Sequence, residues 1–391
     1  MQITMVDAIP VNVPLEPVEV GGIAPYRTNH SVVRDMDRIL VRVETDEGTN
    51  GWGEVRPFLS PAATVSVIEE GVAPLVTGQS PFEIERLRRQ VFAEYADPSM
   101  FFAPIETACW DLVGKRLEKP VYELLGGWTA PRQTAMKNRD HVGEESGSGT
   151  RPESVEFAYC LGIFPPEESR RHARAAVNLG YSVLKTKGGR DWETDVDRIA
   201  AMDEEVDGQL QFRLDPNQGY TVEDAVRVCA KLSDAGVYLQ YLEQPIRIDA
   251  HGSLEQLRSR TRQPIAANED TYLKRSLRQV IAADAIDVAV LDLTPAGGIS
   301  GLRQLAGIAE DAGLSTVHHC AFDLGIRTAA VLHAVSGIPG FDLPSDTAYY
   351  GWERDVITDP FEISEGRIDV PSDPGLGISV DTEAVDRYRL D

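Results

Sequence analysis

The sequence is short of cysteine, of basic residues and of long apolar runs, and each shortage excludes a class of protein. Its four cysteines (Cys109, Cys160, Cys229 and Cys320) have neither metal-type nor disulfide-type spacing, which predicts reduced thiols in a cytoplasmic protein. Only 38 Lys and Arg stand against 62 Asp and Glu, a net charge of −24, so we expect no nucleic-acid partner and no anionic membrane surface. We see neither a signal peptide nor a membrane-spanning segment.

Acidic residues end three successive apolar runs. They are Asp215 in QFRLD, Glu243 in LQYLE and Glu269 in PIAANE. A carboxylate at the end of a buried strand costs free energy unless something binds there. Hard oxygen ligands favour Mg²⁺. The alternative is that they are ordinary helix caps or strand-end charges, but three in register favour a metal site.

The spacing of the polar residues predicts repeated βα units. Lys187, the three acids, Asp292 and His319 follow one another at intervals of about two dozen residues. The segments between them have apolar residues at helical spacing; examples are 191–206, 221–235, 272–284 and 300–312. A closed β/α barrel gathers all strand C-termini on one face. An open doubly wound sheet is the competing fold, but no glycine-rich phosphate loop follows a first strand.

Three regions are predicted along the chain. Residues 1–130 show strands first and then helices at 61–75, 81–95 and 103–117, which indicates an α+β domain. Residues 131–340 hold the β/α repeats, with a Gly- and Ser-rich surface insertion at 137–155 beside the first barrel strand, EFAYCLGI. Residues 341–391 are expected to supply the last barrel strand and return to the first domain.

Several motifs together resemble the mandelate racemase/muconate lactonizing enzyme family of the enolase superfamily. They are the segment 103–127, K-T-K, D-P-N-Q, E-Q-P, the GGIS after Asp292, and PGLGISVD near the end. The resemblance spans nearly the whole chain. It implies a modified TIM (β/α) barrel with an N-terminal α+β capping domain completed by the C-terminal segment. It also implies one Mg²⁺, a homo-oligomer, and abstraction of a proton α to a carboxylate through an enediolate.

Lys185 and Lys187 lie two residues apart, so both point to the same face of a strand, here the barrel interior. Two ammonium groups side by side lower one another's pKa, which suits Lys187 as a base and leaves Lys185 to bind the substrate carboxylate. The alternative is a solvated surface pair, but the apolar run YSVL precedes them.

Asp292 and His319 end the sixth and seventh strand signals and are expected to be neighbours. An aspartate that accepts from one imidazole nitrogen fixes the tautomer, and the pair resembles the His-Asp dyad of the mandelate racemase subgroup, which faces the lysine across the substrate. His318 is the alternative member. Asp342, in GFDLP, is a candidate proton-donating electrophile, although the family places a glutamate near this position.

The third metal ligand and the substrate contacts are less defined. Glu269 matches the mandelate racemase pattern, whereas Asn268 fills the aspartate position of other relatives and Asp270 is expected to cap the next helix. Candidate substrate-binding residues lie in polar loops of the first domain and after one metal ligand: Tyr26, Arg27, His30, Arg56 and Asn217. Exposed loop polarity explains the first four as well, and a turn explains Asn217 as well.

The predicted reaction is dehydration of a sugar acid or related hydroxy acid, a small-molecule carboxylate. Racemisation or epimerisation of a hydroxy or amino acid derivative is the second reading, and cycloisomerisation is the third. A catalytically silent ligand-binding barrel is the alternative from another class.

Overall fold

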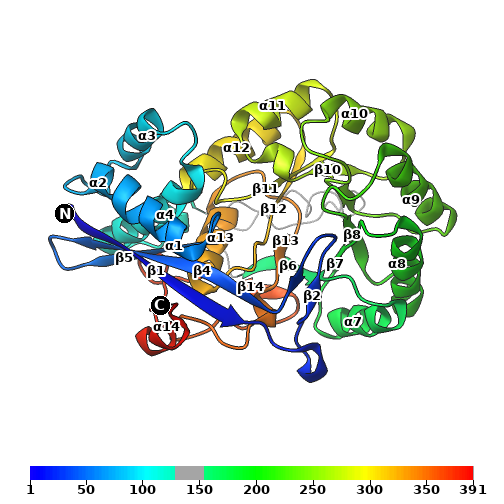
Figure 1. Cartoon of the computed structure of the whole chain (residues 1–391), viewed down its shortest axis with the longest axis horizontal. Coiled ribbons are helices and arrows are strands. Elements are labelled where there is room, and N and C mark those ends of the chain that lie inside the picture. The colour runs from blue at the N-terminus through cyan, green and yellow to red at the C-terminus, as the bar shows by residue number, and fades with distance from the viewer. Residues whose placement is uncertain (128–153, 391) are drawn as a thin grey trace, which may run out of the picture.

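Eight parallel strands form a barrel in the computed structural model, which describes residues 1–127 and 154–390. The sheet order is β12-β11-β10-β9-β8-β7-β6-β13, and β13 pairs with β6 in parallel. Every neighbouring pair along this order is parallel, so the strand C-termini share one face (Figure 1). The strands are β6 (Ser154–Leu161), β7 (Val183–Lys187), β8 (Gln211–Asp215), β9 (Tyr241–Glu243), β10 (Ile265–Ala267), β11 (Val288–Leu291), β12 (Ser315–His318) and β13 (Ser345–Thr347).

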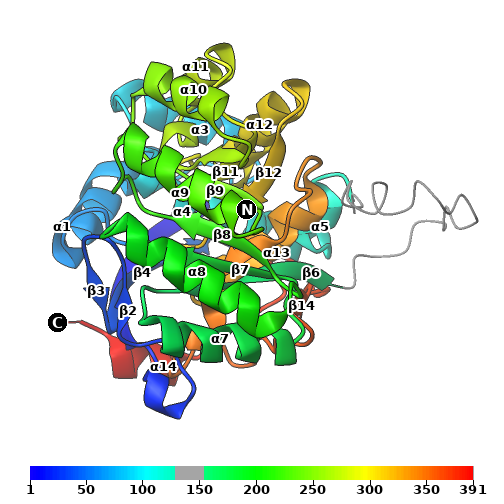
Figure 2. The same cartoon turned by 90° about the vertical axis from the view of Figure 1, so that its right-hand side faces the viewer.

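Helices connect successive strands and cover the barrel from outside. Figure 2 shows α7 and α8 running side by side over β7. The connecting helices are α7 (Pro166–Asn178), α8 (Trp192–Val206), α9 (Val222–Asp234), α10 (His251–Arg260), α11 (Lys274–Ala282), α12 (Ile299–Asp311) and α13 (Gly325–Gly337). Local sequence fixes some ends, since Thr221 and Asp224 form a reciprocal capping box at the start of α9. The β/α repeats read from the sequence are therefore confirmed.

The N-terminal cap is an antiparallel sheet covered by helices. The strands β1 (Ile3–Pro14), β4 (Asp35–Thr45) and β5 (Asn50–Val55) lie in the order β1-β4-β5. The helices are α1 (Pro61–Ser66), which continues through a π-helical turn at Val67–Val72 into α2 (Ala73–Val76), then α3 (Ile84–Glu94), α4 (Ser99–Leu117) and α5 (Val121–Leu124). Alternate residues of β4 (Ile39, Val41 and Val43) pack with apolar residues of α4 in a separate core, as expected for a strand with one buried face.

Two glycines of β5 let α4 approach the cap sheet. A Cβ on Gly53 would lie 1.9 Å from the carbonyl oxygen of Pro104, and one on Gly51 would lie 2.2 Å from that of Ala108. Both obstacles are helix backbone, which cannot move without displacing α4. The NGWGEV sequence therefore fits a strand that touches a helix closely.

Gly53→Ala is expected to lower the free energy of unfolding by at least about 2 kcal/mol, because the new methyl group overpacks the β5–α4 contact. Urea unfolding followed by circular dichroism measures this change. Gly307→Ala in α12 is the control, because its Cβ would meet nothing within 4 Å and alanine favours a helix. Equal stability of the Gly53→Ala variant and the parent would contradict the proposed close contact.

The C-terminal segment returns from the barrel to the cap. After β13 it forms β14 (Arg367–Asp369), antiparallel to β6, and α14 (Thr382–Tyr388), which packs near β1. The amide of Leu376 donates to Asp111 of α4, and the amide of Leu390 donates to the Pro10 carbonyl. The cap is thus completed by the end of the chain, as predicted (Figure 1). The predicted boundary near residue 130 and most of the predicted insertion at 137–155 lie outside the described residues.

A loop of the cap reaches the strand ends of the barrel. It contains the short helix Val18–Val20 and the strands β2 (Tyr26–Arg27) and β3 (Val32–Val33). The carbonyl of Arg27 accepts from the amide of Ile163, just after β6, and that of Thr28 accepts from Nε of Arg190, just after β7. The cap therefore covers part of the face where the strands end.

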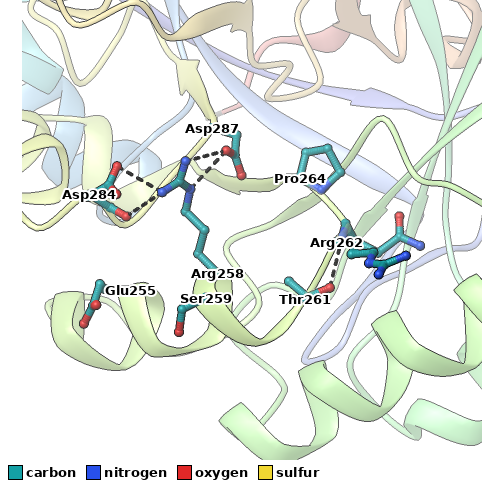
Figure 3. Close-up of a pocket in the computed structure, with 9 residues that line it drawn as sticks. Glu255, Arg258, Ser259, Thr261, Arg262, Pro264, Asp284 and Asp287 are labelled. Carbon is teal, nitrogen blue, oxygen red and sulfur yellow. Dashed lines mark hydrogen bonds and ion pairs between the residues drawn. The ribbon is translucent and has the colours of Figure 1, made fainter.

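The opposite end of the barrel carries a polar groove between α10 and the start of β11 (Figure 3). Arg258 of α10 binds Asp284 and Asp287 there, with Nη2 of Arg258 2.9 Å from Oδ1 of Asp287. Within the described residues, no helix is both long and apolar enough to cross a bilayer.

Candidate active site

The two lysines of β7 point into the barrel among carboxylates. Nζ of Lys185 lies 2.7 Å from Oε1 of Glu243, 2.7 Å from Oδ2 of Asp346 and 3.4 Å from Oδ2 of Asp215. Nζ of Lys187 lies 2.5 Å from the same Oδ2 of Asp215. The prediction that both lysines face the interior is confirmed.

The expected pKa effect at Lys185 is wrong. Burial by itself would lower the pKa of Lys185, but the carboxylates of Asp346, Glu243 and Asp215 outweigh burial and raise that pKa well above its usual value. The neighbouring ammonium group is not the dominant charge, because more acids than lysines surround it. Lys185 is therefore a fixed cation.

Asp215 and Glu243 end neighbouring strands, and their carboxylates differ in electrostatic environment. Burial would raise the pKa of Asp215, but Lys187 and Lys185 hold it well below its usual range. Burial, together with the nearby Asp215 charge, raises the pKa of Glu243 to about 8. An additional cation beside these two acids would relieve their repulsion.

Glu269 begins a 3-10 turn (Glu269–Thr271) immediately after β10. Its Oε1 accepts from Nε2 of Gln218, in the loop after β8, at 2.9 Å. Its Oε2 is buried and has no hydrogen-bond partner among the described residues. A buried, unpartnered carboxylate oxygen is costly. A hard divalent cation fits this donor set of carboxylates.

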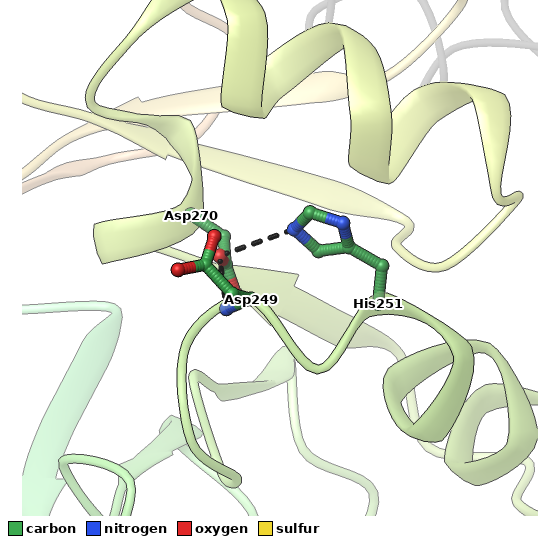
Figure 4. A group of neighbouring side chains, drawn as sticks. All are labelled: Asp249, His251 and Asp270. Atoms are coloured by element: carbon green, nitrogen blue, oxygen red, sulfur yellow. Dashed lines mark hydrogen bonds and ion pairs between the residues drawn. The ribbon is translucent and has the colours of Figure 1, made fainter.

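The neighbours of Glu269 have other partners. Oδ1 of Asp270 accepts from the Asp249 amide and faces Nε2 of His251 (Figure 4). Oδ2 of Asp270 accepts from Nε2 of Gln244. Asp270 does not cap α11, which begins without a side-chain cap, so that expectation is wrong. One ligand atom from each of Asp249, His251 and Asp270 lies within 4.8 Å of the others, but this group is not the predicted ligand set.

Asn268 is held by the barrel. Its Nδ2 donates to the carbonyl of Val290, and its Oδ1 accepts from the hydroxyl of Tyr272. Both polar ends of this amide are thus used within the fold. Asn268 is therefore engaged in the fold, and Glu269 stays the predicted third ligand beside Asp215 and Glu243.

Asp292 and His319 are in contact, as predicted. Nδ1 of His319 lies 2.9 Å from Oδ2 of Asp292, an arrangement that leaves Nε2 for other chemistry. His319 follows the last residue of β12 rather than ending the strand. His318 is fully buried, its Nε2 accepts from the Leu293 amide, and burial lowers its pKa to about 4. His319 is thus the histidine of this pair.

The lysines and the histidine lie on opposite sides of the barrel. Lys187 ends β7 and His319 follows β12. In the sheet order, β6 and β13 separate these strands in one direction and β8 to β11 in the other. The carboxylates of Asp215, Glu243 and Glu269 come from the strands between them, so basic groups flank an acidic centre.

Asp342 does not lie with these residues, so its predicted place in the site is wrong. Its Oδ1 accepts from the amide of Thr316, and its Oδ2 from the hydroxyl of Ser315. These residues begin β12, at the opposite end of the barrel from His319. The sequence signal GFDLP precedes the last strand, which is Ser345–Thr347.

The residue of the last strand that does reach the interior is Asp346, which no sequence pattern indicated. Its Oδ1 accepts from Nη1 of Arg213 at 2.8 Å, and its Oδ2 binds Lys185. The motif PSDT has too few apolar residues to signal a strand. Only the three-residue parallel pairing with β6 identifies it.

The predicted substrate-binding residues of the cap occupy different environments. Tyr26 is buried, and its ring packs edge-on against Phe322 at 5.0 Å, between the cap loop and the loop after β12. Burial raises the pKa of Tyr26 well above its usual value. Arg27 bonds back to the Pro25 carbonyl, while His30 and Arg56 are exposed.

Asn217 lies at the strand-end face, directly after Asp215 and Pro216. Its amide donates to Oδ1 of Asp215 at 3.0 Å, and its backbone has φ 46°, a left-handed conformation. Its Oδ1 is buried and has no partner among the described residues. The turn role of Asn217 is therefore confirmed, while its role as a substrate-binding residue stays a prediction.

Comparison with known families decides the class of the chain. A model described as enolase C-terminal domain-like matches residues 168–385, and the N-terminal domain model of mandelate racemase / muconate lactonizing enzyme matches residues 13–126. This chain belongs to the mandelate racemase/muconate lactonizing enzyme family. The sequence resemblance and the modified barrel with its cap are thereby confirmed.

Individual relatives differ in reaction. The L-Ala-D/L-Glu epimerase of Bacillus subtilis is 28% identical, over 90% of this chain and 92% of its own length. Arabinonate dehydratase of Saccharolobus solfataricus is 24% identical, over 90% and 91%. The structure of a dipeptide epimerase from Enterococcus faecalis with Mg and a dipeptide has a TM-score of 0.85 and 26% identity, covering 97% of this chain and 100% of that one. These similar proteins are enzymes, which supports an enzymatic function here.

Proposed function

We propose that this protein removes a proton α to the carboxylate of a small molecule, with Mg²⁺, and that the reaction proceeds to dehydration of a sugar acid or related hydroxy acid. The observation that carries the proposal is the placement of Lys187 and the His319–Asp292 pair on opposite sides of three carboxylates. Such a site reaches a bound carbon from two faces.

Mg²⁺ would be held by Asp215, Glu243 and Glu269. The Oε2 atom of Glu269, which is buried and has no partner among the described residues, fits a cation. When bound, it would offset the second negative charge that builds on a substrate carboxylate after proton loss. The relative from Enterococcus faecalis, whose structure includes Mg, supports the choice of ion.

The side chains of this chain have distinct roles in the proposal. Lys187 would take or return a proton on one face, and Nε2 of His319 would do so on the other. Asp292 holds the histidine by its Nδ1. Lys185 would attract the substrate carboxylate as a fixed cation. The cap residues Tyr26 and Arg27 would line the site from the side that the cap loop covers.

In dehydration, one base removes the α-proton and the protonated base on the other face gives its proton to the departing β-hydroxyl as water. The carbon–oxygen bond breaks as the carbon–carbon double bond forms. Both protons therefore move through Lys187 and His319, with no further co-reactant.

Epimerisation or racemisation is the second candidate, and the epimerases among the relatives favour it. It uses the same two groups, because one takes the α-proton and the other returns one to the opposite face of the same carbon. The two candidates differ only in whether a β-hydroxyl leaves.

The test is solvent exchange in D₂O with Mg²⁺ across both enantiomers of a panel of hydroxy acids and amino acid derivatives, followed by proton NMR. We expect loss of the α-proton signal with release of water for at least one sugar acid. Deuterium incorporation with loss of stereochemistry and no dehydration would support epimerisation instead. No exchange by a correctly folded, Mg²⁺-loaded protein would support a silent binding barrel and overturn the proposal.

A further inference from the structure

A chain of buried charged groups joins the cap to the His319–Asp292 pair. In the cap, Arg38 of β4 and Glu54 of β5 form an ion pair of 2.7 Å, and both side chains are fully buried. Nη1 of Arg38 also donates to the carbonyl of Ala321, in the loop after β12. This contact ties the cap sheet to the loop that carries His319.

Glu54 also accepts from the first turn of the barrel helix α13. Its Oε1 accepts from the amide of Leu324 and its Oε2 from the amide of Arg327, both at 2.8 Å. These amides have no partner within the helix, and a carboxylate is favourable at a helix N-terminus. Glu54 therefore fixes the turn that carries Arg327.

The side chain of Arg327 extends from this turn to Asp292. Its Nη2 lies 2.6 Å from Oδ1 of Asp292, its Nε donates to Oγ1 of Thr294 at 3.1 Å, and its Nη1 binds Asp323. The Arg327 side chain is 1% exposed. All three edges of the guanidinium are occupied, which leaves it one orientation.

The carboxylate of Asp292 is consequently held in one orientation by hydrogen bonds to both of its oxygens. Its Oδ1 accepts from Arg327 and from the amide of Thr294, and its Oδ2 contacts Nδ1 of His319. Burial would raise the pKa of Asp292, but Arg327 and His319 hold it well below its usual range. The carboxylate is thus kept charged and aimed at the imidazole.

We propose that Arg327 is a positioning residue for His319, acting through Asp292, and that Glu54 of the cap fixes Arg327 in turn. The inference rests on the proposed function only where catalysis is measured. It gives the cap a second role beyond contacting substrate, because the buried series of contacts from Glu54 through Arg327 and Asp292 orients His319. Lys187, on the other side of the barrel, has no place in this chain of contacts.

The structural part is tested without any substrate. We would label the histidines with ¹⁵N and identify the His319 signals by their loss in His319→Asn. In the parent, Nδ1 is expected to carry the proton shared with Asp292, and Arg327→Gln should produce a mixture of both tautomers. A His319 spectrum unchanged by Arg327→Gln would overturn the proposal.

The catalytic part is tested with the hydroxy acid or amino acid derivative that exchanges its α-proton fastest in the panel. The exchange rate is measured for each enantiomer of that compound. Arg327→Gln should slow exchange on the His319 face about a hundredfold, the scale of a misplaced catalytic group, and leave the Lys187 face within about threefold. Arg327→Lys should recover part of the loss, and Glu54→Gln should show a smaller loss on the same face.

Arg258→Gln is the matched control. It also removes an arginine that binds two carboxylates, Asp284 and Asp287, but at the opposite end of β11 (Figure 3). We expect unchanged rates on both faces. Equal loss on both faces in Arg327→Gln would indicate a general structural defect and contradict the positioning role. Absence of exchange in the parent would count against the proposed function alone, since the tautomer measurement would still decide the role of Arg327.

Discussion

Lys187→Met is expected to slow α-proton exchange at least about a hundredfold for one enantiomer of the substrate, which is the usual contribution of a positioned base. The other enantiomer should still exchange, because His319 and Asp292 lie across the barrel and their 2.9 Å contact does not involve β7. His319→Asn should give the reciprocal result. Proton NMR in D₂O with each pure enantiomer measures both rates.

Methionine keeps the unbranched, flexible shape of the Lys187 side chain, is one atom shorter, and removes the charge. The loss of its contact with Asp215 also changes the acidic centre, so Mg²⁺ binding must be measured for the variant and exchange compared at saturating Mg²⁺. His172→Asn is the control for the histidine substitution, since His172 lies on α7 and contacts Tyr159 and Phe164. If each variant lost α-proton exchange for both enantiomers, the result would contradict two bases acting on opposite faces.

Glu269→Gln is expected to weaken Mg²⁺ binding by at least about a hundredfold, because it removes the charge of a proposed ligand in the buried acidic centre. Mg²⁺ that binds only the folded protein raises its stability, by about 2.7 kcal/mol at a hundred times Kd. Thermal unfolding across a Mg²⁺ titration should therefore show an increase in Tm for the parent and almost none for Glu269→Gln.

Asp270→Asn is the matched control, because it changes the adjacent carboxylate. Asp270 accepts hydrogen bonds from Gln244 and the Asp249 amide, so the variant should lose stability but keep its response to Mg²⁺. The reverse result, in which Asp270→Asn loses the response and Glu269→Gln keeps it, would move the metal to Asp249, His251 and Asp270.

The sequence was informative where a residue's role follows from its place on one strand. Asp215, Glu243, Asp292 and His319 each end or follow an apolar run, and in a parallel barrel the strand ends lie on one face whatever the details of packing. The same reasoning placed both β7 lysines inside. It failed at Asp342 because the last strand has a weak sequence pattern, so the strand was placed a few residues too early; it is Ser345–Thr347.

By itself, the sequence determined the repeated βα order, the acidic centre and the nearness of Asp292 to His319, since these depend on local periodicity and strand direction. Only the tertiary structure decided that Asp346 neutralises Lys185 and that Glu54 and Arg327 hold Asp292. The Lys185–Asp346 and Glu54–Arg327 contacts join residues more than a hundred positions apart. The Arg327–Asp292 contact joins a barrel helix to the end of a strand 35 positions earlier. They arise only when the barrel closes and the cap docks, so no spacing along the chain encodes them.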